Sequence, residues 1–245
     1  MAGNWKMFKT PAETTAFFEK FRPLVEKSEH CEIVICPPFT NLAAAVAAAQ
    51  GSPIQVGAQN IAWAKEGAFT GEISGGMIRA VGATHAIVGH SERRQYFGET
   101  NATVLKRTQA ALEYGLTPIV CVGELLEERE AGRTEAVLVE QFTDGIAGLT
   151  PEQFGKIVIA YEPVWAIGTG KTATPEIAED AHKVIRGQAA AKYGDAAAQA
   201  VRILYGGSVK PDNVKGLMAQ PDIDGGLVGG ASLDPKSFTG IVNFQ

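Results

Sequence analysis

Three ionisable side chains stand at or just after the ends of short apolar runs, where a parallel sheet would end its strands. They are Lys6, His90 and Glu162. A carboxylate, an imidazole and an ammonium group can together move a proton next to a carbonyl and stabilise the anion that results. Taken singly, each has an ordinary explanation as a solvated or hydrogen-bonding residue at a strand end. Their meaning therefore depends on whether the fold brings them together.

Two of these residues have surroundings that predict how they ionise. Glu162 follows an apolar run and precedes Pro163, so we expect partial desolvation to raise its pKa towards that of a general base. His90 precedes a predicted helix start at Ser91. The free N–H groups of that helix start are expected to keep the imidazole neutral and able to donate to a carbonyl.

Glycine pairs follow two other apolar runs near the end of the chain. Gly206-Gly207-Ser208 and Gly229-Gly230 can expose main-chain N–H groups to an anion, because glycine lets the backbone approach a ligand closely. Tight turns are the alternative explanation for such pairs. In barrels of alternating strands and helices, however, the loops after the seventh and eighth strands commonly bind phosphate.

The segment 163–172 contains fragments of two binding motifs, and each fragment lacks a feature that its motif requires. It ends like a phosphate-binding loop, but Trp165 occupies the position of the required first glycine. Gly168-x-Gly170 also matches a loose dinucleotide fingerprint. Six residues separate it from the strand end, where that fingerprint needs a tight turn. We interpret the segment as a flap with an apolar tip, whose glycines can bind an anion.

Eight apolar runs alternate with amphipathic helical stretches along the chain, such as Pro175–Tyr193, which Thr174 can cap while Pro175 fits its first position. Their near-continuous hydrophobicity predicts parallel strands covered on both faces. Eight units of about 30 residues predict an α/β fold of the (β/α)8 TIM barrel type, a single domain over residues 1–245. An open, doubly wound sheet satisfies the same pattern. The predicted strands are Ala2–Lys6, Cys31–Cys36, Ile54–Ala58, His85–Gly89, Thr117–Val122, Lys156–Tyr161, Val201–Tyr205 and Ile223–Val228.

Composition excludes several other classes of protein. The 245 residues are 45% hydrophobic and carry a net charge of −5 in a mixed pattern, which gives no footprint for nucleic acid. No apolar run reaches the roughly 20 residues that cross a bilayer. Cys31, Cys36 and Cys121 are too few and too poorly placed for a metal site, and free thiols predict a cytoplasmic protein. The long loop Gln59–Ile73 is predicted to be functional or to dock on another surface.

Seven segments, spread in order over nearly the whole chain, match the motifs of a known family. They are Ala2-Gly3-Asn4-Trp5-Lys6, Gly57-Ala58-Gln59-Asn60, Gly89-His90-Ser91-Glu92-Arg93-Arg94, Cys121-Val122-Gly123-Glu124, Ala160–Gly170, Tyr205-Gly206-Gly207-Ser208 and Leu227–Ser232. Together they resemble the triosephosphate isomerases. The resemblance implies a cofactor-independent isomerase of glycolysis and gluconeogenesis. Such an enzyme interconverts dihydroxyacetone phosphate and D-glyceraldehyde 3-phosphate through an enediolate.

The resemblance also implies a role for each catalytic residue. Glu162 would be the base that moves a proton between C1 and C2, and neutral His90 would polarise the carbonyl. Lys6 and Asn4 would stabilise the enediolate and bind substrate, while Glu92 would orient Lys6 and the substrate. The phosphate would be held through main-chain N–H groups of Gly168, Ser208, Gly229 and Gly230.

The likeness extends to assembly. The loop Gln59–Ile73 matches the dimer loop of the family, so a homodimer is expected, with Thr70 reaching the active site of the partner. The sequence departs from the family pattern at two points. Its first strand is short, and Phe8 stands where an asparagine is usual, a change expected to matter little for the chemistry.

Two other functions fit parts of the sequence. A dinucleotide-dependent oxidoreductase is suggested by Gly168-x-Gly170 and predicts binding of NAD at micromolar concentrations. A non-catalytic barrel that binds sugar phosphates would explain the glycine loops. It would not need Lys6, His90 and Glu162 together, because binding alone requires no base.

Overall fold

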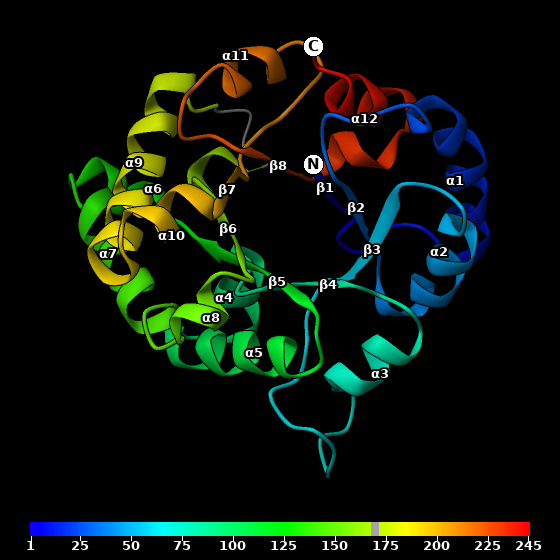
Figure 1. Cartoon of the computed structure of the whole chain (residues 1–245), viewed down its shortest axis with the longest axis horizontal. Coiled ribbons are helices and arrows are strands. Elements are labelled where there is room, and N and C mark those ends of the chain that lie inside the picture. Colours follow the sequence, from blue (N-terminus) through cyan, green and yellow to red (C-terminus); the bar gives the residue numbers. More distant parts are fainter. Residues whose placement is uncertain (168–171) are drawn as a thin grey trace.

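The computed structural model describes residues 1–167 and 172–245, and within these the strands form one closed parallel barrel (Figure 1). The strands follow one another around the barrel in chain order, and β1 pairs with both β2 and β8 to close it. The prediction of a (β/α)8 barrel is therefore confirmed, and the open sheet is excluded. The strands are β1 (Ala2–Asn4), β2 (Ile33–Cys36), β3 (Ile54–Ala58), β4 (His85–Val88), β5 (Thr117–Val122), β6 (Val158–Tyr161), β7 (Arg202–Tyr205) and β8 (Gly225–Val228).

Helices surround the barrel and form its outer layer (Figure 1). Thr10 and Thr174 each cap a long helix that begins with proline, and the predicted helix Pro175–Tyr193 is found with the same bounds. The helices are α1 (Pro11–Val25), α2 (Leu42–Ala49), α3 (Gly75–Ala80), α4 (Ser91–Phe97), α5 (Asn101–Glu113), α6 (Leu126–Glu130), α7 (Thr134–Gly145), α8 (Pro151–Phe154), α9 (Pro175–Tyr193), α10 (Asp195–Ala200), α11 (Val214–Met218) and α12 (Pro235–Val242), with short 3₁₀ turns at Phe39–Asn41, Val164–Ala166 and Gly230–Leu233.

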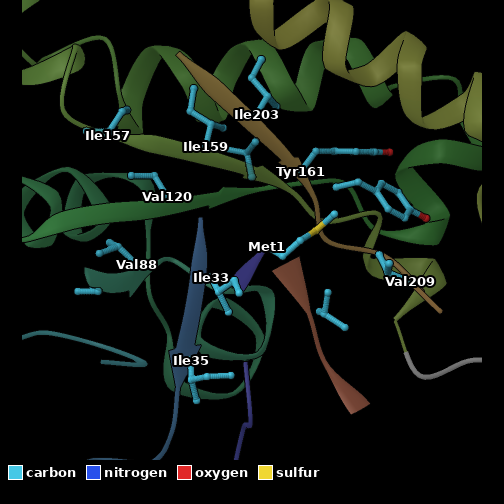
Figure 2. Close-up of a cluster of buried hydrophobic side chains, with 14 of the residues drawn as sticks. Met1, Ile33, Ile35, Val88, Val120, Ile157, Ile159, Tyr161, Ile203 and Val209 are labelled. Carbon is cyan, nitrogen blue, oxygen red and sulfur yellow. The ribbon is translucent and has the colours of Figure 1, made fainter. Parts of the chain in front are cut away.

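In most strands, alternate residues belong to two separate hydrophobic clusters. The larger cluster joins one face of the strands to the helices (Figure 2), and includes Ile33 and Ile35 of β2 and Ile159 of β6. The smaller cluster contains strand residues alone, such as Val34 of β2 and Ala160 of β6, and fills the inside of the barrel. Because Ala160 points inward, the side chain two residues further on, Glu162, continues the inward face at the carboxyl end.

The strands are shorter than predicted at several ends. The first was expected to reach Lys6, but β1 stops at Asn4. Lys6 has a φ of 50°, in the left-handed region that ends an extended strand. The second strand starts at Ile33, so Cys31 precedes it. Despite its three residues, β1 aligns Ala2 with both neighbouring strands and closes the barrel.

The loop between β3 and α3 projects away from the barrel (Figure 1). It corresponds to the predicted loop Gln59–Ile73. Its aromatic residues Trp63 and Phe69 are exposed and pack edge to face, with ring centroids 6.0 Å apart. Within residues 1–167 and 172–245, no helix is long and apolar enough to span a lipid bilayer.

Candidate active site

One cavity at the carboxyl end of the barrel gathers most of the predicted site residues. It has a volume of about 390 Å³. Its walls come from the first, fourth, sixth, seventh and eighth strand-end loops, so residues distant in sequence meet there. Seven predicted residues line it: Asn4, Lys6, His90, Glu162, Ser208, Gly229 and Gly230.

Glu162 and His90 form a close pair in this cavity. The Glu162 Oε1 atom lies 2.8 Å from His90 Nε2, and Glu162 Oε2 accepts a hydrogen bond of 2.9 Å from the main-chain N–H of Ser91. Only 2% of the Glu162 side chain is exposed. His90 also caps α4, because its Nδ1 atom accepts from the N–H of Glu92 at 3.2 Å. A neutral ring in this arrangement carries its proton on Nε2, facing the carboxylate.

The sequence prediction of a raised pKa for Glu162 is wrong for this arrangement. Burial does raise the pKa of the carboxyl group, but His90 and the Ser91 N–H together outweigh it, and the pKa lies below its ordinary value. Burial likewise lowers the pKa of His90, and the Glu162 carboxylate reverses this, so the net direction is upward. The sequence prediction that the helix start disfavours protonation of His90 is therefore wrong for the resting pair: the N–H of Glu92 does donate to Nδ1, but the Glu162 carboxylate outweighs it.

Lys6 is held in place by its backbone as well as by its charge. Its N–H donates to Asn4 Oδ1 at 3.0 Å, and its carbonyl accepts from Gln59 Nε2 at 2.8 Å. Its ammonium group lies 2.5 Å from Glu92 Oε1. A left-handed conformation costs a non-glycine residue about 1–3 kcal/mol, and these contacts maintain it. Asn4 and Glu92 thus orient Lys6, as the family resemblance implies for Glu92.

The glycine loops after β7 and β8 form another part of the cavity wall, and only the loop after β8 has open space beside its main chain. A Cβ atom added at Gly230 would meet nothing within 4 Å, and one added at Gly229 would meet only Lys6 Cε, at 3.6 Å. The main chain there is therefore open towards the cavity, next to the ammonium group. Ser208 follows β7 on the same wall. Gly168, the fourth predicted phosphate-binding residue, lies outside the described residues.

Sequence reasoning missed several residues that shape the site. Gln59 stood at a strand end but received no role, although its amide also donates to Cys36 O at 2.8 Å. Glu124, quoted only as part of a motif, is fully buried and accepts from Tyr161 Oη at 3.1 Å and Trp165 Nε1 at 2.9 Å. Phe8 lines the cavity. Of these three residues, Gln59 and Glu124 could have been found from their positions just after predicted strands.

The other sequence predictions fall outside this cavity. Thr70 is exposed on the projecting loop of the same chain. The three cysteines are free thiols. In the part of the chain that the structure describes, no group of three or more His, Cys, Asp or Glu side chains is arranged to hold a metal ion.

Comparison with known proteins decides the family. The model of the family described as triosephosphate isomerase matches residues 1–245. The chain belongs to the triosephosphate isomerase family. It is 78% identical to a triosephosphate isomerase of Solibacter usitatus over 244 residues, covering 100% of this chain and 98% of that protein. It is 57% identical to one from Citrifermentans bemidjiense, with the same coverage.

The solved structures agree with the sequence relatives. The crystal structure of triosephosphate isomerase from Bartonella henselae is similar to this chain with a TM-score of 0.90 and 38% identity, covering 100% of this chain and 97% of that one. The chain is accordingly an isomerase, of the family that interconverts dihydroxyacetone phosphate and D-glyceraldehyde 3-phosphate in glycolysis.

Proposed function

We propose that this isomerase works without a cofactor, as one catalytic domain over residues 1–245, with Glu162 as its base. The observation that carries the proposal is the meeting of a buried carboxylate, a helix-capping imidazole and an ammonium group in one cavity, beside the open glycine loop after β8. These groups supply proton transfer, carbonyl polarisation and anion stabilisation. No group outside the chain is needed for any of the three tasks.

The reaction moves one proton between neighbouring carbons. The Glu162 carboxylate takes a proton from C1 of dihydroxyacetone phosphate, and the electron pair forms the C1–C2 double bond of an enediolate. The Nε2–H of His90 donates to the carbonyl oxygen as it becomes negative, and the Lys6 ammonium stabilises that charge. Return of the proton to C2, with the hydroxyl proton passing from O1 to O2, gives D-glyceraldehyde 3-phosphate. Atoms and electrons balance without an oxidant.

Substrate binding must first separate the resting pair. A neutral His90 has one proton on Nε2, so it cannot donate to a substrate carbonyl while Glu162 occupies that atom at 2.8 Å. Once Glu162 leaves His90 and the Ser91 N–H, the largest influences that lower its pKa are lost, while its burial and the weaker effect of the Lys6 charge persist. Its pKa then rises towards that of a general base.

The phosphate group is proposed to lie against the glycine wall. Main-chain N–H groups of Gly168, Ser208, Gly229 and Gly230 would bind it, with the Lys6 ammonium close by. Asn4 would add its amide N–H₂, because its Oδ1 already accepts from the N–H of Lys6. The flap predicted over 163–172 includes residues 168–171, which lie outside the described residues.

We further propose that the working form is a homodimer. The projecting loop exposes Trp63 and Phe69, and Met7 is 93% exposed. Large apolar side chains left this exposed favour association. In the dimer, Thr70 would reach the active site of the other subunit. Light scattering should give twice the chain mass, and Thr70→Arg should lower both mass and turnover. A fully active monomer would exclude the dimer as the working form.

A cytoplasmic location and small-molecule partners complete the proposal. Free thiols at Cys31, Cys36 and Cys121 suit a reducing compartment. The mixed charge pattern gives no support to nucleic acid as a partner, and neither nucleic acid nor membrane has a role in the proposed reaction. In gluconeogenesis the same reaction would run in the opposite direction.

Turnover of D-glyceraldehyde 3-phosphate by the purified chain tests the proposal. Formation of dihydroxyacetone phosphate should proceed at the same rate with a metal chelator present and without added nucleotide. A rate that required a metal or NAD would contradict cofactor independence. Protection against unfolding by inorganic phosphate, with no turnover, would instead indicate a barrel that only binds sugar phosphates.

A further inference from the structure

The main chain of Glu162 rests directly on Gly123, the residue after β5. A Cβ atom added at Gly123 would lie 1.8 Å from the carbonyl oxygen of Glu162, so the two backbones are in close contact. The preceding residue adds a hydrogen bond, because Glu162 N donates to Val122 O at 2.7 Å. The backbone at residues 122 and 123 therefore supports the residue that carries the base.

Gly123 is itself held by one side chain from the outer layer. Gln141 of α7 accepts from the Gly123 N–H through Oε1 at 2.7 Å and donates to the Gly123 carbonyl from Nε2 at 3.0 Å. A primary amide is suited to this paired contact, because it offers a donor and an acceptor side by side. The contact continues the β5 hydrogen bonding one residue past the strand. Gln141 is half-buried, so the amide is partly shielded from water.

A second cavity gives this loop room to move if the contact is lost. It has a volume of about 280 Å³ and lies behind Glu162, separate from the substrate cavity. Gly123, Gln141 and Glu162 all line it, with Leu125 and Val164. Close packing therefore does not fix Gly123 on this side, and the paired hydrogen bonds must do so.

We propose that Gln141 is a positioning residue that fixes Glu162 by holding Gly123 against its main chain. The inference rests on the proposed function, because it takes Glu162 to be the base. Gln141 contacts neither His90 nor the glycine loops in the hydrogen bonds that hold Gly123. Its loss should therefore affect the proton-transfer step and leave phosphate binding intact.

The variant Q141M tests this by removing donor and acceptor while nearly keeping the length of the side chain. Because small displacements of a base are costly, kcat should fall roughly 10- to 100-fold. KM and the inhibition constant of inorganic phosphate should stay within about twofold of the parent values. The matched control is Q188M, at a half-buried glutamine of α9 that is not among the described residues lining either cavity. It should match the parent.

A double variant separates positioning from general weakening of the fold. In a background of E162D the carboxylate is already displaced, so adding Q141M should lower kcat by less than about threefold. An equal loss in both backgrounds, or parent-like kcat in Q141M, would overturn the inference. If Q141M does not fold, Q141E can replace it, because a carboxylate still accepts from the Gly123 N–H. Q141E should lower kcat by less than Q141M and leave KM unchanged. A parent-like kcat in Q141E would then overturn the inference.

The parent protein distinguishes this inference from the proposed function. An inactive parent means that the proposed function fails. An active parent with an equally active Q141M means that only the role of Gln141 fails.

Discussion

One histidine starts strand β4 and another lies two residues beyond its carboxyl end, and each lies near a glutamate. At the amino end, His85 Nε2 is 3.7 Å from Glu32 Oε1; beyond the carboxyl end, His90 Nε2 is 2.8 Å from Glu162 Oε1. Both pairs line cavities of similar size, about 320 Å³ and 390 Å³. Only the second pair is proposed to do chemistry, so a histidine beside a glutamate does not by itself define the site.

The partners of each carboxylate explain the difference. Glu32 is 35% exposed and is already bound by Arg202 at 2.6 Å and by Gln55 Nε2 at 2.8 Å. Glu162 is buried, and its contacts with His90 and the Ser91 N–H are ones that a substrate can replace. A parallel barrel directs its helix starts and glycine loops to the carboxyl end. The N–H groups that bind an anion are therefore found beside Glu162.

The largest expected contrast comes from shortening each carboxylate in turn. Glu162→Asp should keep the fold and lower kcat on the order of 10²–10³-fold, because it withdraws the base from the reacting carbon. Glu32→Asp should leave kcat within about twofold. Steady-state kinetics of the two variants measure the contrast. Near-normal turnover by Glu162→Asp would remove Glu162 from the role of base.

Replacing the two histidines should give the next largest contrast. His90→Gln removes the group that polarises the carbonyl and should lower kcat on the order of 10²-fold. His85→Gln should leave kcat within about twofold, since His85 lies at the opposite end of the barrel from the substrate cavity. Comparable losses in the two variants would show that the amino end contributes to turnover.

Inhibition by inorganic phosphate should weaken about tenfold for a change at the carboxyl end of the barrel, and should not weaken for a change at the amino end. Gly229→Val places methyl groups near Lys6 Cε, and inorganic phosphate should then inhibit about tenfold less strongly, with little change in melting temperature. Arg202→Gln removes a cation from the amino end and should not change this inhibition. Equal phosphate affinity in Gly229→Val and the parent would contradict the assignment of the phosphate to the glycine loops.

The smallest contrast concerns stability in acid. Burial lowers the pKa of His85, with Glu32 opposing, so the unfolded chain takes up this proton more readily than the folded one. The resulting stability is present above the ordinary pKa of histidine, about 6.5, and is lost as the pH falls below it. Urea midpoints at pH 7.5 and pH 5 should differ less in His85→Gln than in the parent.

Part of that acid sensitivity should remain in the variant. Burial lowers the pKa of His182 to about 4, and this residue is unchanged in both proteins. An identical acid loss in parent and His85→Gln would show that His85 does not titrate differently on folding.

Much of the fold was predictable because the signals are local. Apolar runs gave all eight strands of the described structure, and Thr174 with Pro175 gave the start of α9. The end of β1 was missed because the left-handed turn at Lys6 depends on Asn4 and Gln59, and Gln59 belongs to another strand-end loop. Long-range contacts of that kind leave no periodic pattern in the sequence.

The sequence predicted which residues form the candidate site better than it predicted their pKa values. Strand-end positions identified Lys6, His90 and Glu162, because the fold brings those ends together. The direction of the Glu162 pKa was missed because it depends on which N–H groups the carboxylate contacts, and those belong to the loop after β4. Gln141 offered no signal, since a glutamine within an amphipathic helix resembles any other polar position.

The most direct test of the account is turnover of D-glyceraldehyde 3-phosphate by the parent, Glu162→Gln and Glu32→Gln, measured side by side. Both variants exchange a carboxylate for an amide of the same shape. Glu32 lies beside His85 at the start of β4, and Glu162 lies beside His90 just beyond its end. We predict parent-like turnover in Glu32→Gln and a loss of more than about 10³-fold in Glu162→Gln, because an amide cannot accept the proton. Substantial turnover in Glu162→Gln would contradict the assignment of the base.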